Sequence, residues 1–410
     1  MLVLTLICLL LMALYGGLIV YYRWAWRRIP AWSPPAMSQS FRTRITVLVP
    51  ARNEEKNIGT CLDAIARQTY PGELYEVIVI DDHSTDGTAG LVKAFAAAAP
   101  FSLTCLPLAD AVRAGTVQGG ANQGEAVPIR AHKKFAIETG ITAAKGDLIV
   151  TTDADCWCDP GWLTAIASYH EATGAKFIAA PVRIGPSLDS PSPRLTDPSS
   201  RRNLLFLLQT LDFVTLQGIT AASVSRNFHS MCNGANLAYE KKAFFEVDGF
   251  KDIDQLPSGD DMLLMHKIYK KYPDKVFFLK NRTAIVSTRA EKTWKGFVHQ
   301  RIRWASKATS YDDRRIFGVL LLVYVVNLLF PLLLLASWWN TWYLWILLLL
   351  ILVKTFVEYP FVRQVAGFFG QRRLMVYFPA LQPLHIAYTV IIGWLGQFGS
   401  YRWKDRKIDK

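Results

Sequence analysis

Two carboxylates one residue apart follow a short apolar run near the middle of the chain. Asp153 and Asp155 flank Ala154 and come directly after residues 148–152. That run has the composition of a buried strand, and ligands in open α/β sheets collect beyond the carboxyl ends of the strands. Two hard oxygen donors at such an edge suit Mg²⁺ or Mn²⁺, which keep waters and bind substrate phosphates. A turn that merely ends a strand would explain the same pair.

Three further polar clusters lie in the same part of the chain. Residues 51–55 read ARNEE, residues 81–88 read DDHSTDGT and residues 258–261 read SGDD. The first two directly follow apolar runs, where carboxylates can hold a base while backbone and basic groups hold the ribose and phosphates. Each also has a structural explanation: acidic residues favour a helix N-terminus, and Asp-Gly is a common turn. Asp260 and Asp261 could likewise only begin a helix.

A fourth cluster, QRIRW at residues 300–304, lies on a helix predicted from Lys292 to Lys307. Arg301 and Arg303 could hold a diphosphate in a bidentate manner, and Trp304 could stack on a sugar or acceptor ring. A basic helix resting on lipid headgroups explains the same residues without a substrate.

Alternating strand and helix signals from Arg44 to Lys280 provide the elements that must position these clusters. A β-α-β-α-β order of this kind predicts a parallel sheet with crossover helices. The predicted strands are residues 44–50, 75–80, 101–106, 148–152 and 176–182, and the predicted helices are residues 54–68, 89–99, 131–144 and 161–172. Residues 108–130 and 186–200 have the composition of surface loops.

The N-terminal end of the chain is apolar. Residues 2–22 carry no charge and, at about 1.5 Å per residue, are long enough to cross a bilayer once. The segment has no basic start and no small-x-small exit, so we interpret it as a retained anchor and not as a cleaved signal peptide. The basic and aromatic residues 23–28 place the following segment in the cytoplasm.

The C-terminal end contains three apolar runs. Residues 316–339 and 342–362 are joined by an uncharged aromatic hinge typical of an outer membrane interface. Lys354 and Glu358 lie one helical turn apart inside the second run, which favours a protein-facing pair. The third run, residues 374–398, contains two prolines and lies between two basic segments, so the sequence leaves open whether it crosses, re-enters or lies at the interface.

Charge and cysteine usage exclude some classes of protein. The net charge of +13 fits anionic headgroups and anionic substrates, whereas no motif suggests nucleic-acid binding. The six cysteines are scattered and are expected to be reduced thiols. Cys156 and Cys158 lack a second Cys or His pair at ligand spacing, which argues against a zinc site.

Taken in order, ARNE, DDxSxDGT, KKFAI, TTDADC, NGANLAY, SGDD and QRIRW resemble the membrane-bound members of glycosyltransferase family 2. The resemblance covers roughly Arg44 to Trp304, and the joint order is far more specific than any single piece. It implies an α/β GT-A (Rossmann-like) catalytic domain, a nucleotide-diphosphate sugar donor such as a UDP-sugar, a divalent Mg²⁺ or Mn²⁺ ion and inversion at the anomeric carbon.

The resemblance also assigns roles to individual residues. The donor side comprises Pro50, Arg52, Glu54, Asp81, Asp82, Lys133, Lys134, Asp153, Gln300, Arg303 and Trp304. The acceptor side comprises Asn233, Gly234, Ala235, Asn236, Asp260 and Trp304. Asp155, with Asp153, binds the metal, and Asp261 is the general base. The family has Glu at the position of Asp260, a departure that leaves the base assignment in place.

The expected organisation follows from these segments. It comprises a transmembrane anchor (1–22), a basic linker (23–43), a GT-A catalytic domain (44–290), an interfacial helix with QRIRW (291–315), a C-terminal transmembrane region (316–400) and a basic tail (401–410).

We predict an inverting, metal-dependent glycosyltransferase in a bacterial inner membrane, with its catalytic domain in the cytoplasm. Its partners would be a nucleotide-sugar, the membrane and a lipid or glycan acceptor. The alternatives are a processive polysaccharide synthase and a non-catalytic sugar-nucleotide binder or scaffold. Three or four crossings are few for a polymer channel, which favours a lipid or short glycan acceptor.

Overall fold

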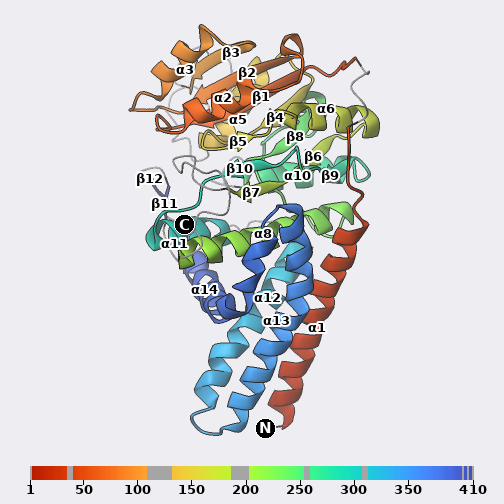
Figure 1. The fold of residues 1–410 in the computed structure, drawn as a ribbon, viewed down its shortest axis with the longest axis vertical. Helices are drawn as coiled ribbons and strands as arrows, with labels where there is room; N and C mark the ends of the chain where they lie inside the picture. Colours follow the sequence, from red (N-terminus) through yellow and green to blue (C-terminus); the bar gives the residue numbers. More distant parts are fainter. Residues whose placement is uncertain are drawn as a thin grey trace. The chain divides into compact units, whose positions relative to one another are not determined.

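The computed structural model describes residues 2–34, 40–108, 132–185, 203–253, 259–306, 313–398, 401–403 and 406–408. It divides into two compact units (Figure 1). The membrane unit comprises Met1–Ile29, Arg183–His229 and Arg289–Lys410, and the sheet unit comprises Pro30–Val182 and Ser230–Thr288. Ser258, the 186–200 loop and all but the first residue of the 108–130 loop lie outside the described residues.

The sheet unit is built on a seven-stranded sheet with the order β3-β2-β1-β4-β8-β6-β9. Its strands are β1 (Ile45–Ala51), β2 (Tyr75–Asp81), β3 (Ser102–Pro107), β4 (Leu148–Thr151), β6 (Phe177–Ala179), β8 (Leu237–Glu240) and β9 (Val276–Phe278). β1 pairs in parallel with β2 and β4, and β2 pairs in parallel with β3, which confirms the predicted parallel pairing for these four strands. The other half is mixed, because β8 runs antiparallel to both β4 and β6.

Helices connect these strands close to the predicted positions. They are α2 (Ile58–Ala66), α3 (Thr88–Ala96), α5 (His132–Ala143), α6 (Trp162–Thr173), α9 (Lys241–Glu246) and α10 (Asp260–Lys271), with a short 3₁₀ turn η1 (Gly72–Leu74). α2 begins four residues later than predicted, because Asn53 has a left-handed backbone (φ 53°) and the Glu54 amide donates to Thr88 Oγ1 at 2.8 Å.

The predicted fifth strand is divided into β6 and β7 (Val182–Ile184), and the chain leaves the sheet unit at β7. Two short strands, β5 (Trp157–Cys158) and β10 (Val286–Thr288), pair antiparallel in a separate sheet. β5 begins directly after Cys156, so the turn that contains Asp153 and Asp155 is held between two strands.

The membrane unit contains long helices with apolar surfaces. They are α1 (Leu2–Arg28), α8 (Leu204–Ser225), α12 (Arg314–Ala336), α13 (Trp342–Phe368) and α14 (Phe378–Phe398), and all five are long and apolar enough to span a membrane. The unit also holds α11 (Trp294–Ala305), a 3₁₀ turn η2 (Arg372–Val376) and a hairpin of β11 (Tyr401–Trp403) and β12 (Arg406–Ile408).

Helix α8 is the longest element that the sequence did not predict. It lies inside the 44–290 range expected for the catalytic domain, yet it groups with the helices of the membrane unit. Figure 1 shows it running across α1 and α13, and most of its apolar stretch is buried within the protein. Asp212, Gln209 and Gln217 are buried on it as well, so its surface has no polar stripe from which a helix could be recognised.

The predicted pairing of Lys354 with Glu358 is confirmed. Lys354 is fully buried and donates to Glu358 Oε1 at 2.7 Å and to Gln382 Oε1 at 2.9 Å. Gln382 in turn donates to Glu358 Oε2 at 2.5 Å, and the Tyr15 hydroxyl also donates to Glu358. These contacts form a closed polar network that joins α1, α13 and α14.

Helix α14 runs alongside α11 in the same direction. The ring of Phe297 lies 5.6 Å from that of Tyr388, Ile302 packs against Ile392, and a Cβ built on Gly396 would lie 2.6 Å from the Ala305 methyl group. Because α11 is an amphipathic, basic helix, a neighbour that follows it residue by residue also lies along the interface. If α11 rests on lipid headgroups, the interfacial alternative therefore applies to the third apolar run as well.

We expect single cysteines at Arg372 and Arg402, which flank α14, to react from the same side of the membrane, and one at Asn340 to react from the other. The measurement is labelling with an impermeant maleimide, in right-side-out and inverted vesicles, on a background without the six native cysteines. Labelling of position 402 from the same side as position 340 would show that α14 crosses.

Candidate functional site

The predicted polar clusters meet at one edge of the sheet because of the strand pairing. Thr151, the last residue of β4, is paired with Leu48 of β1 on one side and with Leu237, the first residue of β8, on the other. The antiparallel direction of β8 therefore brings the loop that precedes it to the carboxyl end of β4. Thr151 fixes that loop by donating from its hydroxyl to the Gly234 carbonyl at 3.0 Å.

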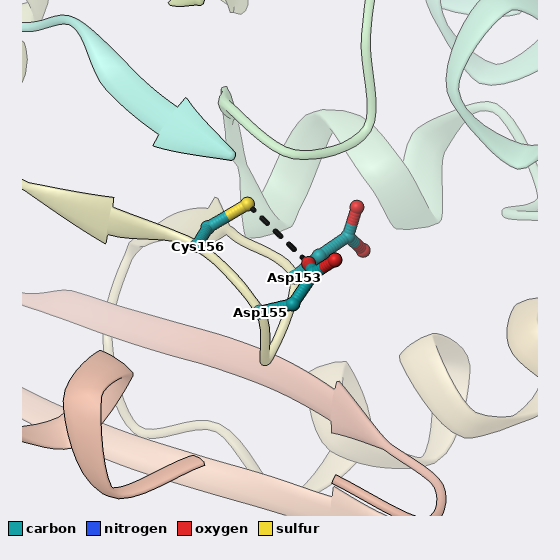
Figure 2. Close-up of side chains that lie close together, drawn as sticks. All are labelled: Asp153, Asp155 and Cys156. Atoms are coloured by element: carbon teal, nitrogen blue, oxygen red, sulfur yellow. Dashed lines mark hydrogen bonds between the residues drawn. The ribbon is translucent and has the colours of Figure 1, made fainter. Parts of the chain in front are cut away.

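Asp153, Asp155 and Cys156 gather in the turn after β4 (Figure 2). One possible ligand atom from each lies within 4.8 Å of the others. The Cys156 thiol is buried and donates to Asp155 Oδ1 at 3.7 Å. Burial raises the pKa of Cys156 and the two carboxylates raise it further, so the sulfur is a protonated donor at neutral pH. Sequence reasoning overlooked this thiol as a support for Asp155.

The two carboxylates fit a hard divalent cation. Both are partly exposed at the sheet edge, and carboxylate oxygens are the donors that Mg²⁺ and Mn²⁺ prefer. A site with few protein ligands leaves coordination positions for water and for the phosphates of a substrate. Cys158 is turned to a different neighbour, since its sulfur accepts from Gln68 Nε2 at 3.4 Å.

Lys133 connects the acidic groups. Its Nζ atom donates to Asp153 Oδ1 at 2.9 Å and lies 3.8 Å from Asp260 Oδ2. Burial alone would lower the pKa of Lys133, but the nearby carboxylates of Asp153, Asp260 and Asp261 outweigh it and raise the pKa. The side chain therefore stays an ammonium ion. Lys134 points elsewhere: it is buried and donates to the Ile253 carbonyl at 2.5 Å.

Asp260 and Asp261 form the first turn of α10, as the structural explanation predicted, and they also face the site. Gly259 precedes the helix with a φ of 84°, a conformation that glycine adopts without strain. Asp261 accepts from the Gly234 amide at 3.0 Å through Oδ2 and from the Met262 amide at 2.8 Å through Oδ1. A Cβ built on Gly234 would lie 3.5 Å from Lys133 Nζ and 3.7 Å from Asp260 Oδ2.

In the loop expected on the acceptor side, residues 233–236, some residues lie in the candidate site and others lie in the core. Gly234 lies among the charged groups, while Asn233 accepts from the Ala235 amide at 3.0 Å and shapes the turn. Asn236 is fully buried: it donates to the carbonyls of Pro181 and Ala284, both at 2.8 Å, and accepts from the indole of Trp162 at 3.0 Å. The Asn236 amide is thus committed to the core and not to an acceptor surface.

The loops after β1 and β2 are hydrogen-bonded to each other. Arg52 Nη1 donates to the Asp82 carbonyl at 2.8 Å, and the Asp82 amide donates to the carbonyl of Ala51, which follows Pro50, at 2.9 Å. The Asp81 carboxylate accepts from the Ser84 amide at 3.2 Å, and that of Asp82 lies 3.0 Å from His83 Nδ1.

Glu54 is buried in this pair of loops, where it accepts from Asn57 Nδ2 at 2.6 Å. Thr88 supports its amide, and Asp86 supports the amide of Glu55 at 3.1 Å. Thr88 and Asp86 were not predicted as partners; the Asp-Gly-Thr turn was the only signal of their position. The two loops therefore form one preformed edge with several carboxylates.

The QRIRW residues lie on α11 of the membrane unit. Gln300 donates to Glu291 Oε1 at 3.2 Å, and Arg303 and Trp304 are partly buried. Arg301, which was predicted to share a diphosphate with Arg303, is only 3% exposed and forms an ion pair with Asp212 at 2.8 Å. That prediction for Arg301 is wrong, because a carboxylate of α8 already holds the guanidinium.

The mixed sheet, the carboxylate pair after β4 and the acidic residues at the start of α10 agree with the GT-A fold that the family resemblance implied. The chain belongs to the family described as glycosyltransferase like family 2, whose profile matches residues 43–307. Sequence reasoning had placed the same family resemblance at roughly Arg44 to Trp304, so the prediction is confirmed.

Comparison with individual proteins agrees at this level. Glycosyltransferase AglE of Haloferax volcanii is 30% identical over 138 residues, which is 34% of this chain and 39% of that relative. Beta-monoglucosyldiacylglycerol synthase of Synechocystis is 23% identical over 184 residues, 39% of this chain and 35% of that relative. The matches therefore span less than half of either relative.

One solved structure shares the fold over most of both chains. It is the mannosyltransferase PcManGT of Pyrobaculum calidifontis, in complex with GDP-Man and Mn²⁺. Its TM-score is 0.52 at 20% sequence identity, and the likeness covers 93% of this chain and 99% of that one. The likeness supports the fold and does not by itself assign a substrate.

The two neighbouring lysines give a test of the site. We expect Lys133→Met to raise the KM for the sugar donor at least about tenfold, because an ammonium ion beside the proposed phosphate site is lost. Lys134→Met should leave that KM near the parental value and lower the melting temperature instead, since it removes the contact to Ile253. Initial rates and thermal unfolding of both variants check this; an unchanged donor KM in Lys133→Met would contradict it.

Proposed function

We propose that the chain is an inverting glycosyltransferase, which moves a sugar from a nucleotide-diphosphate donor, with UDP-sugar as the first candidate, to a hydroxyl group of a membrane lipid or glycan. The supporting observation is the cluster around Gly234, where Lys133, Asp153 and Asp261 from three different elements come together. A sugar-nucleotide binder without activity would not need a base beside the donor-side carboxylates.

The donor is assigned to the preformed edge and to Lys133. In this proposal Pro50, Arg52 and Glu54 line the nucleotide, with Asp81 or Asp82 at the base and ribose. The Lys133 ammonium ion leaves its carboxylate partners in part to meet the diphosphate, and Asp153 contacts the sugar. Asp155, with Asp153, would hold a divalent cation, which when bound offsets the charge of the departing diphosphate.

The base is Asp261. Its carboxylate is oriented by two backbone amides, which leaves lone pairs to accept a proton from an acceptor hydroxyl. The hydroxyl oxygen bonds to the anomeric carbon, the bond from that carbon to the diphosphate oxygen breaks, and the proton passes to Asp261. A single displacement with one base and no carboxylate nucleophile inverts the anomeric centre.

The remaining assignments follow the family resemblance. Gln300, Arg303 and Trp304 keep their proposed roles: Arg303 offsets diphosphate charge, and Trp304 stacks on the sugar or acceptor ring. On the acceptor side, Asn233, Gly234, Ala235 and Asp260 shape the approach through the backbone and one carboxylate.

The acceptor is proposed to be a membrane lipid. Five apolar helices long enough to span a bilayer support a lipid environment, as does the likeness to a diacylglycerol glucosylating relative. The basic residues after α1 support a catalytic domain on the cytoplasmic side of the membrane. We propose that this membrane is a bacterial inner membrane. A processive polysaccharide synthase would use the same chemistry, so the product of the reaction, a glycolipid or a polymer, distinguishes the two functions.

The decisive experiment incubates membranes that contain the protein with a panel of labelled sugar nucleotides. We expect label from one donor to enter chloroform-soluble lipid. Label in polymer would instead establish the polysaccharide synthase. Label in neither fraction for any donor would leave only the non-catalytic binder or scaffold.

The Asp261→Asn variant tests the base. We expect it to bind donor normally and to lose about 10²–10⁴-fold in kcat, the usual contribution of a positioned general base. Asp274→Asn, an exposed aspartate of the same unit, is the matched control and should keep the parental rate. Transfer at the parental rate by a folded Asp261→Asn protein would remove Asp261 from the mechanism.

Removal of divalent cations tests the carboxylate pair. Excess chelator should abolish transfer, and Mn²⁺ or Mg²⁺ should restore it. Isothermal titration should also show that Asp155→Asn weakens Mn²⁺ binding at least about tenfold, because one of few charged ligands is lost. Undiminished activity in chelator would contradict the role given to Asp155.

A further inference from the structure

A buried charged cluster in the membrane unit has no role in the chemistry proposed above. Asp212 of α8 forms an ion pair with Arg301 of α11, with Nη2 and Oδ2 separated by 2.8 Å and the two side chains 5% and 3% exposed. From α14, the Tyr388 hydroxyl donates to Asp212 Oδ1 at 2.7 Å, and His385 Nε2 lies 3.5 Å from the same oxygen. One carboxylate therefore joins three helices.

The same arginine contacts Trp304, the ring of the QRIRW motif. The guanidinium carbon of Arg301 lies 4.2 Å from the centre of the Trp304 ring and 5.0 Å from that of Phe297. Phe213, the neighbour of Asp212 in the chain, approaches Trp304 with ring centres 6.2 Å apart. A planar guanidinium stacks on aromatic faces, so the ion pair constrains the orientation of the indole. Trp304 remains partly exposed and can still meet a ligand.

Stability alone does not explain this pair. Replacing a buried ion pair with apolar residues of similar volume is often neutral or stabilising. Within the described part of the chain, moreover, no atom accepts a hydrogen bond from Nε or Nη1 of Arg301. A guanidinium kept buried with unsatisfied donors is better explained by a requirement on its position than by its contribution to folding.

We propose that Asp212 and Arg301 are positioning residues for the transfer reaction. Asp212 fixes the position of the Arg301 guanidinium, and the guanidinium fixes the orientation of the Trp304 ring. His385 and Tyr388 fix the Asp212 carboxylate from α14. The inference rests on the proposed function, in which Trp304 stacks on the sugar or acceptor, and it adds two residues that do not themselves touch a substrate.

A spectroscopic measurement tests the positioning directly. The full-length protein is labelled with 5-fluorotryptophan, and the ¹⁹F resonance of Trp304 is assigned by its loss in Trp304→Phe. We expect Asp212→Asn and Arg301→Lys to shift or broaden that resonance, because a lysine ammonium keeps the charge but cannot stack as a plane.

Asp313→Asn is the matched control. Asp313 is also a buried aspartate of the membrane unit paired with an arginine, Arg315, at 2.8 Å, and it caps α12. Asparagine caps a helix about as well as aspartate, so this variant should fold. It should leave the Trp304 resonance and the transfer kinetics at their parental values.

Kinetics then tests the consequence for the reaction. We expect kcat/KM to fall about tenfold or more in Asp212→Asn, for the donor or for the acceptor according to which ring Trp304 contacts, as displacement of a positioning group by about 1 Å can produce. Asp212→Glu should recover part of the loss, since it restores the charge facing Arg301.

The outcomes separate this inference from the function on which it rests. An unchanged Trp304 resonance in Asp212→Asn overturns the inference, and so does a shifted resonance with unchanged kinetics for both the donor and the acceptor. If the parental protein transfers no sugar, the proposed function fails, and the resonance alone decides whether Asp212 and Arg301 orient Trp304.

Discussion

The ammonium group of Lys133 is the interaction on which the candidate site depends. Four carboxylates, those of Asp153, Asp155, Asp260 and Asp261, lie in this part of the structure, and like charges a few ångströms apart repel each other strongly in a partly buried setting. Lys133 bridges the donor-side and base-side carboxylates at 2.9 and 3.8 Å. Lys133 thus offsets part of the negative charge that these carboxylates bring together.

The sheet topology makes this pairing possible. A wholly parallel sheet would carry the loop after α8 to the wrong end of β4. Because β8 runs antiparallel, residues 233–236 begin at the carboxyl edge and set Gly234 between Thr151, Lys133 and Asp261. Asn236 then anchors the loop in the core through Pro181, Ala284 and Trp162. The residue that resembled an acceptor contact is therefore what keeps the charged groups in register.

The sequence predicted the parts of this arrangement that depend on local signals. β1, β2, β4 and the turn after β4 have the apolar run and the polar stop that identify a strand end, and α10 has its acidic first turn. What sequence reasoning missed depends on tertiary partners. Asn236 and Arg301 are of residue types that often bind ligands, but Asn236 is bonded to core groups and Arg301 is paired with Asp212. Helix α8 shows no amphipathic period, because most of its surface is covered by the protein. The course of α14, which the sequence left open, also depends on a tertiary partner, because α14 packs along α11.

If α13 spans a membrane, as its length and composition allow, the polar network around Lys354 has a consequence for its insertion. An unpaired charge at the centre of an inserting helix disfavours insertion by about 2.5–3.5 kcal/mol. Lys354 and Glu358 are four residues apart on α13, so they can neutralise each other as soon as that single helix forms. α13 can therefore partition into lipid before Gln382 has been synthesised, and the Tyr15 hydroxyl of α1 gains Glu358 as its partner once α13 is in place. The order of synthesis, from α1 to α13 to α14, is thus compatible with a network that is complete only when the last helix arrives.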